Sequence, residues 1–226
     1  MPLSTKIIKF YSGLRPPAGL PNGVEVLFPQ QRPEVISLVK QFYTKYYNDD
    51  LPRVLLLGIN PGRFGAGETG INFTASRQLK VNCGIDNSLK MQSELSAEFI
   101  YEVVERYGGP QVFFRHFFLG AISPLGYILN GKNINYYDDR ALQTALTPFI
   151  VSSIKEQVRF TSSHNTCICI GEGKNLQFLT RLNSEHGFFK KIVSVPHPRF
   201  ILQYKRKRKE EYVQRYLEVL GEAVSR

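Results

Sequence analysis

VLLLGINPGRFGAGETGINF, residues 54–73, is the stretch that decides the fold of this chain. Val54 to Ile59 is a short apolar run, typical of a strand buried on both faces of a parallel sheet. Asn60-Pro61-Gly62 ends the run, because Pro61 cannot donate a hydrogen bond to a sheet ladder. Further glycines then predict a long, close-turning loop at the carboxyl end of the strand, where open α/β sheets bind ligands. Asn60 is the first polar side chain at that edge, and Phe73 ends the loop with a flat aromatic face.

Strand and helix patterns alternate along the rest of the chain. This alternation predicts a parallel sheet covered by helices on both faces, the three-layer α/β/α class with a central four-stranded parallel sheet. Besides residues 54–59, we expect strands at 112–122, 165–171 and 191–195. We expect helices at 33–47, 95–107, 138–157, 174–186 and 205–223, with Asp138 as a cap and a kink at Pro148 in the third.

Length and composition favour a single domain over residues 1–226. Residues 1–32 are interpreted as an irregular, proline- and glycine-rich N-terminal arm, and residues 33–226 as an α/β core with a basic C-terminal helix. The formal net charge of +10 favours a polyanionic partner, although a generally basic protein is an alternative. Three cysteines and no apolar stretch of membrane-spanning length indicate an intracellular protein, cytoplasmic or nucleoid-associated in a bacterium and nuclear in a eukaryote.

A second polar group follows the last predicted strand. His197 lies between Pro196 and Pro198, so its placement is expected to be rigid. The other three histidines lack such a context and are interpreted as structural or surface residues. Five consecutive cations, residues 205–209, come soon after His197.

Three motifs carry a family resemblance. GINPGRFGAGETGINF resembles the first motif of the uracil-DNA glycosylase superfamily, and most of all that of the single-strand-selective monofunctional branch, G-M-N-P-G-P-F-G-x-x-x-T-G-x-x-F. The element V-P-H-P, residues 195–198, is similar to the second motif, H-P-S-P. CICIGEGKN, residues 167–175, is similar to the family's V-V-G-V-G-R. The resemblance covers about residues 50–220 in segments.

The resemblance implies a monofunctional glycosylase, without lyase activity, that hydrolyses the N-glycosidic bond of uracil in DNA. It implies base flipping, the start of base-excision repair, and a monomer that needs no metal or other cofactor. His197 would donate a hydrogen bond to uracil O2, and Asn60 would hold the attacking water. Phe73 would stack on the flipped base, with Ile59 and Gly62 in the same pocket, where Gly62 leaves room for a substituent at uracil C5.

The sequence departs from the family at two places. The family has an asparagine on its second strand, in H-N-L-C-P-L, and this chain has Ala121; Ser123 is a candidate to replace that amide. The family pattern after the histidine motif is also lost. The candidates for the wedge that fills the gap left by the base, and for phosphate contacts, are Arg199, Phe200, Ile201, Lys205, Arg206, Lys207 and Arg208.

Three alternatives stay open at this point. One is a glycosylase of the same fold with specificity shifted to deaminated purines such as xanthine. Another is a non-catalytic module that binds damaged or single-stranded DNA. The third is a nucleotide-binding protein without a DNA partner. Asn60 and His197 together favour an enzyme, and the cation run favours DNA.

Overall fold

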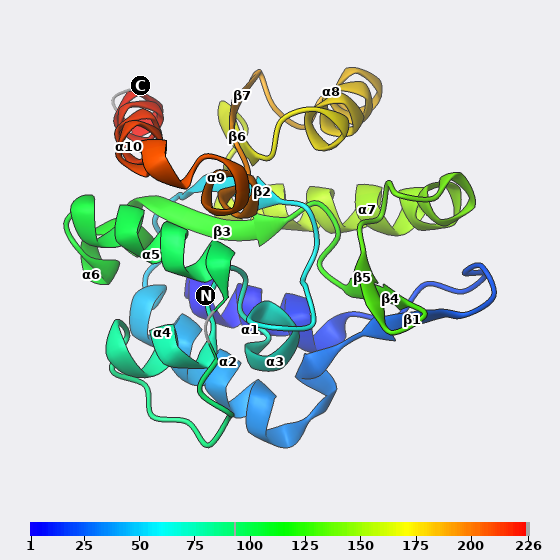
Figure 1. Ribbon diagram of the computed structural model, residues 1–226, viewed down its shortest axis with the longest axis horizontal. Helices are drawn as coiled ribbons and strands as arrows, with labels where there is room; N and C mark the ends of the chain where they lie inside the picture. The colour runs from blue at the N-terminus through cyan, green and yellow to red at the C-terminus, as the bar shows by residue number, and fades with distance from the viewer. Residues whose placement is uncertain (93, 225–226) are drawn as a thin grey trace.

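A parallel sheet of four strands forms the centre of the molecule, in the order β3-β2-β6-β7 (Figure 1). The computed structural model describes residues 1–92 and 94–224. The strands are β2 (Val54–Gly58), β3 (Phe117–Ala121), β6 (Thr166–Ile170) and β7 (Lys191–Val195). All three strand pairings are parallel, with β2 between β3 and β6. The predicted α/β class with a four-stranded parallel sheet is therefore confirmed.

Helices cover both faces of this sheet, because successive side chains of a strand point to opposite faces. On β3, the Phe118 ring packs on Phe160 of α7, 5.2 Å between ring centroids. The Phe117 ring packs on the other side against Tyr107, which follows α5, at 5.2 Å. The longer helices are α2 (Pro33–Tyr46), α5 (Leu95–Arg106), α7 (Arg140–Thr161), α8 (Lys174–His186) and α10 (Lys209–Val224).

The N-terminal segment is ordered, and the prediction of an irregular arm over residues 1–32 is wrong. It contains helix α1 (Leu3–Gly13), strand β1 (Val24–Leu27) and the short turn η1 (Pro29–Gln31). Leu3, Ile7 and Tyr11 recur every four residues and are buried, so they give α1 one apolar face. Strand β1 pairs antiparallel with β4 (Gly126–Leu129), which pairs with β5 (Lys132–Ile134) in a second, three-stranded sheet.

Three other predicted boundaries are corrected. The expected strand 112–122 is the helix α6 (Pro110–His116) followed by β3, because Pro110 occupies the first turn of a helix. Helix α7 begins after Asp139, whose carboxylate accepts the Leu142 N–H, and it continues through Pro148. The expected helix 205–223 begins with the turn η2 (Arg206–Arg208) and becomes α-helical only in α10, and a further helix, α9 (Pro198–Tyr204), precedes it. The basic run therefore forms a connection before the last helix.

Short helices occupy the loop region after β2. These are α3 (Ala66–Thr69) and α4 (Ser76–Val81). Gly67 in α3 allows the chain to approach Gly62 closely, because a Cβ there would collide with the Gly62 carbonyl oxygen. The loop thus folds back over the carboxyl end of the sheet.

Strand β3 is at the edge of the sheet, and side chains cover its outer carbonyl groups. The Phe117 carbonyl accepts the Tyr47 hydroxyl at 2.9 Å. The Leu119 carbonyl accepts the Asn72 amide at 3.3 Å, and the Ala121 carbonyl accepts the Gln157 amide at 2.9 Å. Side-chain donors from three separate segments therefore occupy positions that another strand would otherwise take.

Candidate active site

A pocket of about 310 Å³ opens at the carboxyl ends of β2 and β3. Its size is within the range of small-molecule sites. Six residues predicted to contact the base or react with it line this pocket, together with one predicted to contact DNA: Ile59, Asn60, Gly62, Phe73, Ala121, His197 and Arg199. The strand β2, the loop after it and the loop after β7 thus bring distant parts of the sequence to one place. The chemical roles of these side chains stay predictions.

Backbone groups next to β5 fix the Asn60 side chain. Its Nδ2 donates to the Ile134 carbonyl at 3.3 Å, and its Oδ1 accepts the Tyr136 N–H at 3.1 Å. An amide oxygen has two lone pairs, so Oδ1 can accept one further hydrogen bond. A water molecule in the pocket could donate that bond, but the amide cannot remove a proton as a strong base.

A tight turn holds Phe73 over β2. Phe73 has φ 55°, in the left-handed region that non-glycine residues seldom adopt. The Thr69 hydroxyl closes the turn by donating to the Thr74 carbonyl at 2.6 Å and accepting the Ile71 N–H at 3.2 Å. A Cβ on Gly58 would lie 2.6 Å from the Phe73 ring, so the glycine makes space for that ring.

His197 is held in one tautomer. Its Nδ1 accepts the Arg199 N–H at 3.2 Å, so the proton of the neutral imidazole lies on Nε2. Burial, and to a smaller extent the nearby Arg199 charge, lowers the pKa of His197 to about 4. The imidazole is therefore neutral at pH 7 and presents one N–H donor. Tyr216 of α10 fixes the preceding residue by donating its hydroxyl to the Pro196 carbonyl.

The Phe73 and His197 rings face the same pocket. Their centroids are 6.2 Å apart with an angle of 44° between the ring planes. One ring offers a stacking surface and the other a hydrogen-bond donor, while Asn60 offers an acceptor. Together these groups can hold a planar, polar ring and a water molecule.

Ser123 does not take part in this pocket, contrary to the prediction. Its side chain is fully buried, and its hydroxyl bonds to the Leu125 carbonyl at 3.1 Å and to the Tyr127 hydroxyl at 2.8 Å. It is therefore not available to read a base. Ala121 does line the pocket, and its methyl group supplies no polar contact.

The wedge prediction is corrected in part. Ile201 is fully buried in the core, so it cannot insert into DNA without local unfolding. Phe200 is 45% exposed and Tyr204, which was not predicted, is 72% exposed; their ring centroids are 5.7 Å apart. Phe200 and Tyr204 are therefore exposed rings on α9, the helix that follows His197, and Phe64 in the pocket lining is 45% exposed as well.

The cation run, residues 205–209, divides into members with an ion pair and members without one. Arg208 pairs with Glu211 at 2.6 Å, and Lys209 pairs with Glu102 at 2.7 Å. Within residues 1–92 and 94–224, no carboxylate forms an ion pair with residues 205–207, which are exposed. Arg208 is thus a weaker candidate for phosphate contact than its neighbours.

Sequence reasoning missed several residues of the pocket. Asn133 and Asn135 come from β5 and the segment after it, in a second sheet that the sequence did not predict. Asn72 lies inside the first motif, next to Phe73, yet its polar side chain was not singled out. Its place directly beside Phe73 at the end of the motif was the available signal for it.

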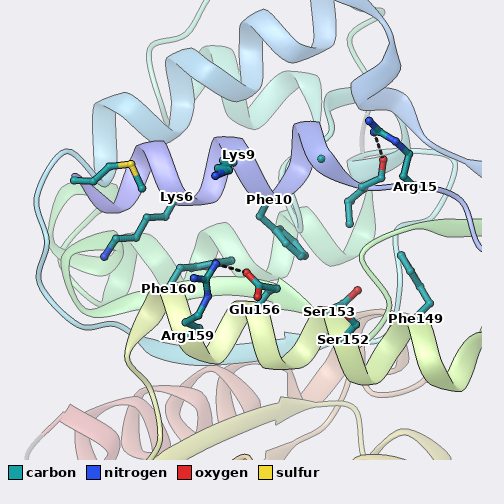
Figure 2. A pocket seen from close by; sticks show the side chains of 13 residues that line it. Lys6, Lys9, Phe10, Arg15, Phe149, Ser152, Ser153, Glu156, Arg159 and Phe160 are labelled. Carbon is teal, nitrogen blue, oxygen red and sulfur yellow. Dashed lines mark hydrogen bonds and ion pairs between the residues drawn. The ribbon is translucent and has the colours of Figure 1, made fainter.

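A larger cavity, of about 570 Å³, lies between α1 and α7, and no motif residue lines it. Figure 2 shows Lys6 and Phe10 of α1 extending toward α7, where Glu156 pairs with Arg159. In the part of the chain that the structure describes, no three His, Cys, Asp or Glu side chains form a possible metal site. None of the described helices is long and apolar enough to cross a membrane.

Comparison with known proteins agrees with the motifs. A model of the uracil DNA glycosylase superfamily matches residues 44–221. The single-strand selective monofunctional uracil-DNA glycosylase of Rattus norvegicus is 31% identical over an alignment that spans 42% of this chain and 41% of the rat protein. The crystal structure of Pedobacter heparinus SMUG2 superposes with a TM-score of 0.94 at 39% identity, covering 98% of this chain and 97% of the other.

Proposed function

This chain belongs to the uracil DNA glycosylase superfamily, and on that premise we propose that it hydrolyses the N-glycosidic bond of uracil, including C5-substituted uracils, in DNA. The observation that carries the proposal is the shared pocket of Asn60, Phe73 and His197. We also propose that it works as a monomer on a flipped base and begins base-excision repair.

The groups in the pocket match the charges that this reaction develops. As the bond between C1′ and N1 breaks, its electron pair moves onto uracil, and the sugar becomes an oxocarbenium-like cation. The Nε2–H of His197 donates a hydrogen bond to the charge on uracil O2. Because the imidazole has a pKa of about 4, it acts as a neutral donor and not as an acid.

Water then completes the reaction. The free lone pair of Asn60 Oδ1 holds a water molecule beside C1′. Its oxygen bonds to the sugar carbon, one of its protons passes to solvent, and the uracil anion takes up a proton. Phe73 supports the base by stacking.

DNA reaches the pocket across a basic and aromatic rim. Arg199 lines the pocket, and exposed residues 205–207 follow α9. Phosphate contacts of this kind supply affinity without sequence preference. Phe200 and Tyr204 offer exposed rings to fill the space that a flipped base leaves.

One observation favours a second specificity. Ala121 replaces the asparagine expected on the second strand and leaves a small apolar wall in the pocket. A purine such as xanthine or hypoxanthine is then a possible second substrate class. A binding module without catalysis is the other rival, and it would retain DNA affinity but release no base.

The test is base release from oligonucleotides that carry uracil, hydroxymethyluracil, xanthine or hypoxanthine, as single strands and duplexes. Asn60→Ala and His197→Ala should each slow uracil release by on the order of 10²–10³-fold, the range for one positioned catalytic contact. The exposed His164→Ala is the matched control and should keep the full rate. Absence of base release by the unaltered protein, with DNA binding retained, would identify the binding module.

A further inference from the structure

Asn72 is a buried amide at the wall of the pocket. It is 5% exposed and lines the pocket together with Phe73 and Ala121. Its Nδ2 donates to the Tyr11 hydroxyl at 3.0 Å and to the Leu119 carbonyl at 3.3 Å. A buried amide with both N–H groups bonded has a fixed position.

The orientation of this amide follows from its partners. A carbonyl oxygen can only accept, so the NH₂ group of Asn72 faces Leu119 and Oδ1 faces away from it. Among the residues that the structure describes, none donates to Oδ1. Oδ1 is also not among the side-chain oxygen and nitrogen atoms that are completely buried without a hydrogen-bond partner. Oδ1 is therefore the part of the side chain that remains open to the pocket.

The backbone around Asn72 is equally constrained. The Thr74 hydroxyl donates to the Asn72 carbonyl at 3.1 Å, and the Thr69 hydroxyl closes the same turn. Rotation of the side chain would place Oδ1 against the Leu119 carbonyl, which is unfavourable for two acceptors. The pocket thus contains a preorganised acceptor that cannot change into a donor.

We propose that Oδ1 of Asn72 reads the ring N–H of the flipped base, a role that rests on the proposed glycosylase function. Deamination converts cytosine, with a bare N3, into uracil, with N3–H. It likewise converts adenine, with a bare N1, into hypoxanthine, with N1–H. An acceptor fixed at this position favours each product over the base from which it forms. Guanine with N1–H and thymine with N3–H also carry a ring N–H, so their rejection depends on other groups.

The position of Asn72 also accounts for Ala121. Asn72 bonds to Leu119, two residues before Ala121 on the same edge strand. The Asn72 amide, held by the loop after β2, therefore lies close to Ala121, the position on β3 where the family has an asparagine. The acceptor comes from the loop and not from the strand.

The test compares two DNA ligands that resist hydrolysis, both with a 2′-fluoroarabino sugar. One carries uracil, and the other carries pyrimidin-2-one, which keeps O2 but has a bare N3. Wild-type protein should bind the uracil ligand more tightly. In Asn72→Leu this preference should fall by about tenfold or more, as expected for one polar base contact. The affinity for the pyrimidin-2-one ligand should stay nearly unchanged.

Two further variants make the result interpretable. Asn72→Ser keeps a polar group near Leu119 but is too short to reach the base, so it should lose the preference as well; it also serves if the leucine variant does not fold. Tyr127→Phe removes a buried hydroxyl that bonds to Ser123 and should leave the preference intact. Equal loss of affinity for both ligands, or an unchanged preference, would overturn the assignment. Failure of the wild type to release uracil would instead remove the proposed function.

Discussion

Gly58 is a position where one methyl group should damage the pocket without touching a polar residue. A Cβ there would lie 2.6 Å from Phe73 Cζ and 2.7 Å from Cε2, closer than real contacts allow. The ring cannot easily withdraw, because Phe73 has φ 55° in a turn closed by Thr69. Gly58→Ala must therefore displace the ring, and overpacking of this kind costs about 1–3 kcal/mol.

The assay measures stability and uracil release on the same variant. For a domain of this size each kcal/mol lowers Tm by roughly 2–4 °C, so we expect a fall of about 2–12 °C. Uracil release should slow by about tenfold or more, since the stacking surface moves away from His197 and Asn60. Gly13→Ala is the matched control, because a Cβ there has no atom within 4 Å. Wild-type Tm and rate for Gly58→Ala would refute the geometry of the Phe73 ring.

Three other changes have defined outcomes. The pKa of His197 is 6.5 in the unfolded chain and about 4 in the folded protein. As the pH falls, the unfolded state therefore takes up the proton first, and the free energy of unfolding should decrease by about 3 kcal/mol between pH 6.5 and pH 4. Urea unfolding should show a smaller decrease for His197→Gln. Replacing residues 205–207 with alanine should reduce the slope of log K for duplex binding against log salt concentration by roughly 0.9 for each phosphate that the variant no longer neutralises. Arg208→Ala should change this slope little, because Arg208 is already paired with Glu211. Tyr216→Phe loses the hydrogen bond to the Pro196 carbonyl and should slow uracil release more than it weakens binding to abasic DNA; equal effects would mean that Tyr216 serves only the core.

The sequence predicted the elements whose pattern is local. β2, β6 and β7 are short apolar runs that end in proline or glycine, and the structure has them within about one residue of the expected limits. The motif residues Asn60, Phe73 and His197 meet because parallel strands bring their carboxyl ends to one edge. Local pattern and fold class were sufficient for this part.

The remaining features depend on contacts between distant segments. Helix α1 is an exception, because Leu3, Ile7 and Tyr11 recur at helical spacing and were overlooked beside the proline- and glycine-rich residues that follow; this face packs against α2 and α7. β1 forms because β4 pairs with it across about a hundred residues of sequence. Asn72 and Asn133 become pocket residues only through these arrangements. The mistaken strand at 112–122 has a different cause, since aromatic residues in α6 have high strand propensity but follow a proline that starts a helix.

The side-chain cover of strand β3 has a consequence for how the chain avoids association. The three donors come from Tyr47, Asn72 and Gln157, which reach β3 from the end of α2, the motif loop and α7. Until those segments dock, a folding intermediate exposes an apolar edge whose carbonyl groups can pair with another molecule. Docking of α2, the loop that carries Asn72, and α7 therefore covers the edge of the sheet against intermolecular strand pairing. We expect that weakening these donors increases aggregation during refolding before it alters the finished protein.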